Sequence, residues 1–177
     1  MKPQLTISLL ASKQIHAVRK CLDSLVPILM SIPSELIVVD TSEKDYIREL
    51  VLQYTPHVIP FHWCNDFSKA RNTGMQMARG EWFLFIDDDE WFEDPGEIIT
   101  FFSSGEYLQY NTACYTVRNY FDWMGTSYRD ASLSRMIRLT PEAKFLNPIH
   151  EYLSPLREPI KVLSAYVHHY GYTGKVL

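Results

Sequence analysis

The chain has 177 residues, of which 46% are apolar and 21% are charged. This globular composition excludes a disordered, collagen-like or coiled-coil chain, and the length suits a single domain, 1–177, better than two. Lys and Arg number 17 against 21 Asp and Glu, and the net charge of −4 argues against nucleic acid as a partner.

Apolar runs and helical spacings alternate from the N-terminus. Leu5–Ala11 is an uninterrupted apolar run, as expected of a strand buried on both faces. Apolar residues then recur every three or four positions, which predicts an amphipathic helix that Pro27 or Pro33 ends. Leu36–Val39 is a second buried strand, and it ends at Asp40.

The same alternation continues to residue 90. Asp45–Tyr54 has a helical composition, and an apolar stretch follows at Val58–Trp63. A further three-and-four spacing predicts a helix that starts near Phe67. Trp82–Ile86 is a fourth strand and runs directly into Asp87. The order β-α-β-α-β-α-β predicts a Rossmann-like parallel sheet with ligands at the carboxyl ends of its strands.

The second half of the chain has a different character. Its strand candidates are Cys114–Phe121, Ser132–Leu139 and Ile160–Tyr170. We therefore expect a nucleotide-binding α/β half at 1–90 and a β-richer half at 91–177 that faces a second substrate.

The cysteines and the hydropathy bear on the compartment. Cys21, Cys64 and Cys114 form no C-x-x-C pair, which predicts neither a disulfide framework nor a zinc site and favours a reducing compartment. The longest stretch without Lys, Arg, Asp or Glu, Leu50–Asn65, contains two prolines, so we expect no transmembrane segment. We expect a cytoplasmic protein, and peripheral association with the inner membrane face stays open.

The most informative stretch is Ile86–Glu90, where four acids follow an apolar strand. Alternate residues of an extended chain share a side, so Asp87 and Asp89 would point the same way, about 7 Å apart. Two such carboxylates repel unless a proton, an arginine or a cation lies between them. Oxygen ligands suit magnesium or manganese, which also bind phosphate. A hydrated surface loop is the alternative.

Several segments together resemble glycosyltransferase family 2, whose members have the GT-A fold. They are Asp40, FSKARNTG at 67–74, EWFLFIDDDE at 81–90, RMIR at 135–138, IHE at 149–151 and HYGY at 169–172. The last three resemble a branch that includes lipopolysaccharide-core glucosyltransferase-like and peptide S-glycosyltransferase-like enzymes. The resemblance implies an α/β, GT-A fold with a mostly parallel sheet flanked by helices and a β-richer acceptor-side half.

The resemblance also implies an activity and a set of site residues. It implies metal-dependent, inverting transfer from a nucleotide diphosphate sugar, most often a UDP-sugar, to a glycan, lipid-linked or peptide acceptor in cell-surface glycan or glycoconjugate synthesis. The implied donor-binding residues are Asp40, Arg71, Asp87, Asp88 and Arg138. Asp89 and His169 are the implied ligands of a manganese or magnesium ion, and Glu151 is the implied catalytic base. A homodimer is compatible with this short, aromatic-rich chain.

Each assignment has an alternative. Arg71 could pair with the acids at 87–90, Asp40 could cap the next helix, and one of His168 and His169 must face the core. Arg135 and Arg138 could contact phosphate or lie on a solvated strand, and Glu151 could be a surface acid.

Aromatic residues and function also leave choices open. Trp91, Trp123, Tyr120 and Tyr128 could line a sugar or acceptor cleft or pack in the core. Competing functions are a nucleotidyltransferase or phosphohydrolase, and a non-catalytic subunit that binds a sugar nucleotide or a partner.

Overall fold

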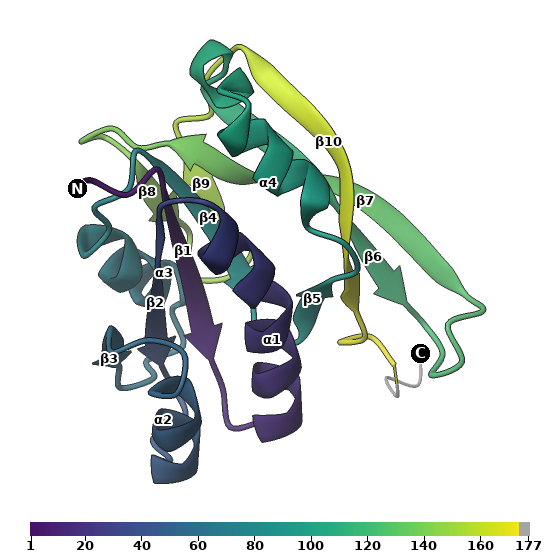
Figure 1. Cartoon of the computed structure of the whole chain (residues 1–177). Helices are drawn as coiled ribbons and strands as arrows, with labels where there is room; N and C mark the ends of the chain where they lie inside the picture. The colour runs from purple at the N-terminus through teal and green to yellow at the C-terminus, as the bar shows by residue number, and fades with distance from the viewer. Residues whose placement is uncertain (174–177) are drawn as a thin grey trace.

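Eight strands form one mixed sheet in the computed structural model, which describes residues 1–173 (Figure 1). The strand order is β3-β2-β1-β4-β7-β6-β10-β5. The bounds are β1 Leu5–Ala11, β2 Ser34–Asp40, β3 Val58–Pro60, β4 Trp82–Asp87, β5 Glu90–Phe92, β6 Thr112–Tyr120, β7 Tyr128–Arg138 and β10 Ile160–His169. A separate two-stranded sheet pairs β8 (Lys144–Leu146) with β9 (Tyr152–Ser154).

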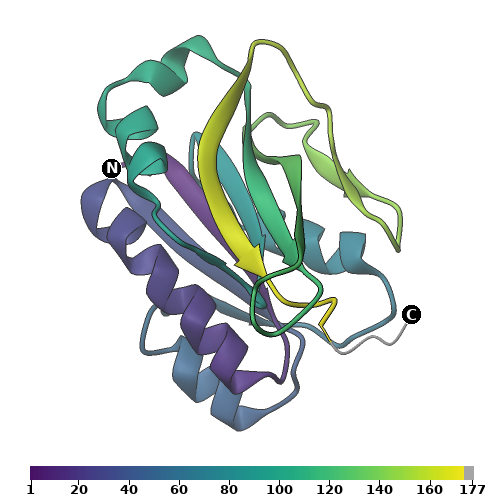
Figure 2. The same ribbon diagram turned by 90° about the vertical axis from the view of Figure 1, so that its right-hand side faces the viewer.

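Helices and the small sheet cover both faces of the large sheet (Figure 2). The helices are α1 Ile15–Ser31, α2 Asp45–Val51, α3 Phe67–Gln76 and α4 Gly96–Ser103, with a 3-10 turn, η1, at Glu106–Gln109. The larger core cluster joins α1, α2 and α4 to one face, and Val18, Ile47 and Phe101 are among its buried members. On the other face α3 and the β8–β9 pair form a smaller core around Phe83 and Phe145.

The parallel first half is confirmed, with two changes of detail. Strands β3, β2, β1 and β4 are parallel neighbours. Pro27 does not end the first helix, which continues to Ser31 with Pro33 beyond it, because Pro27 lies on the solvent side while the adjacent Ile28 stays buried. The third strand is shorter than expected and ends at Pro60, although the Phe61 N–H still donates to the Asp40 carbonyl at 2.9 Å.

The second half extends the same sheet. Strand β7 pairs antiparallel with β4, β6 pairs antiparallel with β7, and β10 pairs parallel with β6. The three strands expected there are confirmed, whereas β5, α4, η1 and the β8–β9 pair were not predicted. Strand β5 follows β4 closely in sequence, yet β4 lies in the middle of the sheet and β5 pairs with β10 at one edge, four positions away.

This topology gathers the carboxyl ends of the central strands. Ala11 is in register with Asp40, and Leu10 is in register with Asp87. The ends of β1, β2 and β4 therefore meet at one edge, where the acidic segment begins. Within residues 1–173, none of the helices has both the length and the hydropathy to cross a bilayer.

Candidate active site

A cavity of about 710 Å³ opens at this edge, and we call it the main cavity. Its lining includes Ser12, Lys13, Thr41, Ser42, Trp63, Arg71, Asp87, Asp88, Asp89, Glu151 and His169. Strand β4 ends at Asp87 and the next two residues form a turn, so the alternation expected of an extended chain does not apply. The turn nevertheless brings the side chains of Asp87 and Asp89 to the same cavity as Glu151.

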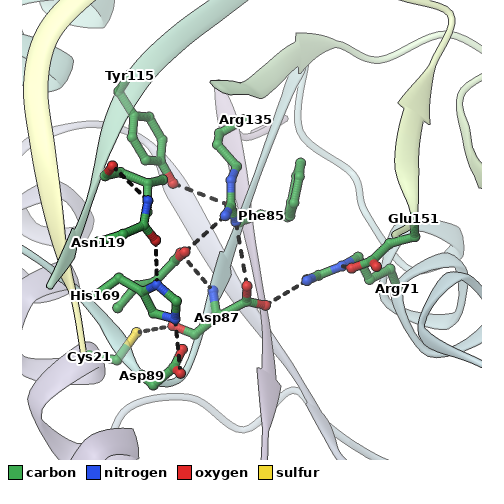
Figure 3. A network of polar contacts seen from close by, with 12 residues as sticks. Cys21, Arg71, Phe85, Asp87, Asp89, Tyr115, Asn119, Arg135, Glu151 and His169 are labelled. Carbon is green, nitrogen blue, oxygen red and sulfur yellow. Dashed lines mark hydrogen bonds and ion pairs between the residues drawn. The ribbon is translucent and has the colours of Figure 1, made fainter. Parts of the chain in front are cut away.

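A buried arginine joins two of these acids (Figure 3). Arg71 on α3 donates from Nη2 to Asp87 Oδ1 at 2.5 Å and from Nε to Glu151 Oε1 at 2.7 Å. Asp66 caps α3 by accepting from the backbone N–H of Lys69, which fixes the helix start. Pairing of Arg71 with the acidic segment, the alternative drawn from the sequence, is therefore observed, and it reaches Glu151 as well.

A second buried arginine balances the acids behind the cavity. Arg135 donates from Nη2 to Glu90 Oε1 at 2.8 Å, and its Nη1 lies 3.8 Å from Asp87 Oδ2. Burial raises the pKa of Asp87, but Arg71 and Arg135 more than offset it and lower that pKa to about 2. Burial raises the pKa of Glu90, and Arg135 offsets only part of the rise. Arg135 is therefore a buried structural partner and does not lie on a solvated strand.

Asp88 connects the acidic turn to the loop after β1. The backbone N–H of Ser12 donates to Asp88 Oδ2 at 2.6 Å. Burial raises the pKa of Asp88 to about 6, although hydrogen bonds from Ser12 oppose the shift. The loop and the turn thus form one wall of the main cavity.

Asp89 and His169 lie in direct contact at the main cavity (Figure 3). His169 Nε2 lies 3.2 Å from Asp89 Oδ2, and Nδ1 lies 2.7 Å from Asn119 Oδ1. Asn119 therefore holds the Nδ1 proton and turns Nε2 toward Asp89. Burial lowers the pKa of His169, but the hydrogen bond and charge of Asp89 outweigh it, so the net shift is upward.

A glycine leaves space beside this pair. A Cβ at Gly171 would lie 2.4 Å from His169 Nε2 and 2.9 Å from Asp89 Oδ2, closer than real contacts allow. Carboxylate, imidazole and an open cradle fit a divalent ion that also takes phosphate or water oxygens. Among the described residues no group of three or more His, Cys, Asp or Glu could hold a metal ion by itself.

The structure does not bring every implied donor-binding residue to this cavity. Asp40 ends β2 and accepts from the backbone N–H of Ser42 at 2.9 Å; it borders the main cavity through Ser42, and Lys44 rather than Asp40 precedes α2. Arg138 lies at the other end of β4, in register with Trp82, and pairs with Glu81. The prediction that Arg138 binds the donor therefore has no geometric basis, because the length of β4 separates it from Asp87.

Three further residues shape the site, although their roles were not predicted from the sequence. Asn119 reaches His169 only because β6 and β10 pair in register at these two positions. Trp63 comes from the loop after β3, and Gly171 follows β10. The glycine in HYGY could have indicated a close approach of the backbone at Gly171. No sequence signal marks Asn119 or Trp63, because the role of Asn119 depends on the strand register and that of Trp63 on the path of a loop.

Comparisons with known proteins agree with the motifs. The model of the family described as Glycosyl transferase family 2 matches residues 12–157. The SPbeta prophage-derived glycosyltransferase SunS of Bacillus subtilis is 30% identical over 84% of this chain and 34% of its own length. A TPR repeat-containing protein of Synechococcus elongatus is 26% identical over 96% of this chain and 42% of its own length. The chain thus spans less than half of these curated relatives.

Solved structures share the fold. Staphylococcus aureus TarS 1–349 has a TM-score of 0.52 at 18% identity over 67% of this chain and 36% of that one. The mannosyltransferase PcManGT of Pyrobaculum calidifontis, solved with GDP-Man and Mn²⁺, has a TM-score of 0.51 at 15% identity over 64% of this chain and 35% of that one. The α/β, GT-A fold and the family resemblance drawn from the sequence are confirmed.

Proposed function

Because this chain belongs to glycosyltransferase family 2, we propose that it transfers a sugar from a nucleotide-sugar donor to an acceptor. The observation that carries the proposal is the main cavity, which joins Asp87, Asp89 and His169 to Glu151. A candidate cation site and a candidate base in one cavity would supply two functions for sugar transfer from a diphosphate, neutralisation of the leaving group and acceptance of the acceptor proton.

We propose that the donor is a UDP-sugar. A TarS structure with a TM-score of 0.53 to this chain was solved in complex with UDP, which supports this choice. Thr41, Ser42 and Trp63 line one part of the main cavity and would contact the base and ribose, with Asp40 behind them. Asp87 is already neutralised by two arginines, so its contribution would be to accept a hydrogen bond from the ribose.

Asp89 and His169 would hold a manganese or magnesium ion against the donor diphosphate. When bound, the ion neutralises the negative charge that grows on the diphosphate as the sugar–phosphate bond breaks. Asn119 keeps His169 Nε2 directed at this position, and Asp88 secures the neighbouring loop. The Mn²⁺ in the mannosyltransferase structure supports the choice of ion.

Glu151 would act as the base of an inverting transfer. The acceptor hydroxyl or thiol gives its proton to Glu151 while its oxygen or sulfur bonds to the anomeric carbon, and the nucleoside diphosphate leaves from the opposite face. Arg71 contacts Oε1 and so orients the carboxylate. We propose that the acceptor belongs to cell-surface glycan or glycoconjugate synthesis, as the family resemblance implies, and that transfer takes place in the cytoplasm, as the cysteine pattern favours.

Ligand binding and donor hydrolysis test this function. We expect UDP to raise the melting temperature only with Mn²⁺ or Mg²⁺ present, and a panel of nucleotide sugars to reveal one that is hydrolysed. Glu151→Gln should slow turnover by about 10²–10⁴-fold and leave UDP binding nearly unchanged. No shift across the nucleotide panel would contradict the proposal, and unchanged turnover in Glu151→Gln would remove Glu151 as the base.

A further inference from the structure

A second cavity, of about 640 Å³, adjoins the main cavity and shares Ser12, Asp88 and Asp89 with it. We call it the aromatic cavity, because Trp91, Trp123 and Tyr170 form part of its lining. The three rings come from β5, from the turn between β6 and β7, and from the residue after β10. Figure 2 shows this hairpin turn beside the end of β10. Gln14, Ala17 and Lys20, at the start of α1, complete the lining.

The rings lie nearly parallel. The Tyr170 ring is stacked with that of Trp91, with 5.5 Å between the ring centroids and 3° between the planes. It is also stacked with the Trp123 ring, at 6.0 Å and 9°. Tyr120 stacks against Tyr170 at 4.2 Å from the buried side. The hairpin turn is itself held in place, because the Asp122 carboxylate accepts from the backbone N–H groups of Thr126 and Ser127. The stacked rings are therefore preorganised by contacts within the chain.

Core packing does not account for the outermost ring. Trp123 is 72% exposed, although burying so large a ring would favour the folded state. Its ring continues the stacked series out into solvent beside the cavity. The sequence left open whether Trp91, Trp123, Tyr120 and Tyr128 pack or line a cleft; Tyr120 packs, and Trp91 and Trp123 line the aromatic cavity.

The polar rim of the aromatic cavity limits the class of ligand. Asp88 and Asp89 lie at the shared wall, and Gln14 and Lys20 lie along α1 and its start. The Lys20 ammonium is 3.9 Å from the Trp91 ring centroid, where it is attracted to the ring face. Lys20 is the one basic side chain among the described lining residues, and its ammonium already faces a ring, so the cavity offers little to a phosphate. A neutral ligand with an apolar face and hydroxyl edges matches the Trp123 ring and the polar rim together.

We propose that the aromatic cavity binds a neutral pyranose ring of a glycan acceptor, stacked on the exposed face of Trp123. The C–H face of the sugar packs on the Trp123 ring, and its hydroxyls reach Gln14, Lys20 and Asp88. This inference rests on the proposed function, and it assigns the acceptor to the glycan class. The two cavities meet at Asp88 and Asp89, so an acceptor seated here adjoins the donor.

Saturation-transfer NMR tests the inference with methyl β-D-glucopyranoside and methyl N-acetyl-β-D-glucosaminide as probes, in the presence of UDP and Mg²⁺. We expect saturation of the ring C–H protons of at least one glycoside. Trp123→Ala should weaken its binding about 2- to 10-fold, the range of a stacked aromatic contact, and Trp123→Phe should restore most of it.

Trp63→Ala is the matched control, since Trp63 lines the main cavity. Trp63→Ala should weaken UDP binding and leave glycoside binding unchanged. Trp123→Ala should weaken glycoside binding and leave UDP binding unchanged. A glycoside signal that is missing from the UDP-bound wild type, or unchanged in Trp123→Ala, would overturn the inference. Two results with Trp123→Ala would also overturn it: loss of UDP binding, or loss of binding to phospholipid vesicles with no loss of glycoside binding. Absence of UDP binding by the wild type would instead defeat the proposed function.

Discussion

The two ends of the parallel strands differ in how their charged side chains are balanced. At the amino end Glu35 accepts from the Thr6 hydroxyl at 2.7 Å and from the Arg79 backbone and guanidinium at 2.7–2.9 Å. The carboxyl end gathers five carboxylates, Asp87, Asp88, Asp89, Glu90 and Glu151, against two guanidinium groups, Arg71 and Arg135.

The difference separates a structural charge cluster from a ligand site. The amino end is balanced within the chain and needs no further partner. The carboxyl end keeps an excess of negative charge in a partly buried place, where burial, together with the charges of Asp89 and Asp87, raises the pKa of Asp88. Such an excess is compensated when a cation binds, so this end is poised for a ligand.

The largest effect is expected from Arg71→Met. Removing this buried guanidinium leaves Asp87 and Glu151 without their closest positive partner, which should cost about 3–5 kcal/mol of unfolding free energy. Urea unfolding measures the loss. Arg79→Met is the control at the amino end; because its side chain is 65% exposed, we expect about 1 kcal/mol there. Equal losses would contradict the comparison.

Asn119→Ala sharpens the comparison from the ligand side. Without Asn119 Oδ1 the His169 ring loses the contact that directs Nε2 toward Asp89. We expect Mg²⁺-dependent UDP binding to weaken about 10–100-fold, measured by calorimetry. Asn111→Ala, which removes a hydrogen bond to the Glu158 carbonyl instead, should bind as wild type does.

Glu35→Gln tests the amino end and its pH dependence. Burial raises the Glu35 pKa, but hydrogen bonds from Thr6 and Arg79 and the charge of Arg79 lower it overall from its usual 4.5. A lowered pKa stabilises the fold above the unfolded value, and this contribution is lost as pH falls through the folded pKa. We expect Glu35→Gln to lose about 1–2 kcal/mol at pH 7 and the difference to shrink below about pH 4. A pH-independent difference would contradict this.

The smallest effect is expected from Asp89→Asn. Asp89 belongs to the excess of negative charge, so removing its charge should change the unfolding free energy by no more than about 0.5 kcal/mol. Thermal unfolding without metal measures this. A loss of unfolding free energy above 1 kcal/mol would mean that the charges at the carboxyl end are balanced within the chain, as those at the amino end are.

The sequence predicted the elements with strong local patterns. The apolar runs at Leu5–Ala11 and Trp82–Ile86 are strands β1 and β4, and the stripe that begins at Ile15 is α1. The order of strands and helices also predicted that Asp87 lies at the ligand-binding end of the sheet. These predictions succeed because periodicity and burial are local properties of the chain.

What the sequence did not predict depends on register and topology. The contact of Arg71 with Glu151 joins α3 to the loop before β9, and nothing near either residue specifies it. Arg138 matched a motif but lies at the wrong end of β4, because β7 runs antiparallel to that strand and carries it away from Asp87. Motif residues on an antiparallel neighbour therefore need their register before a role is assigned.

The acidic turn is also a mechanical link. It is the short covalent tie between β4 at the centre of the sheet and β5 at its far edge, and Glu90 of β5 is in register with His169 of β10. The same two-residue turn therefore does two jobs: it presents Asp88 and Asp89 to the main cavity, and it fixes where the edge strand begins beside β10.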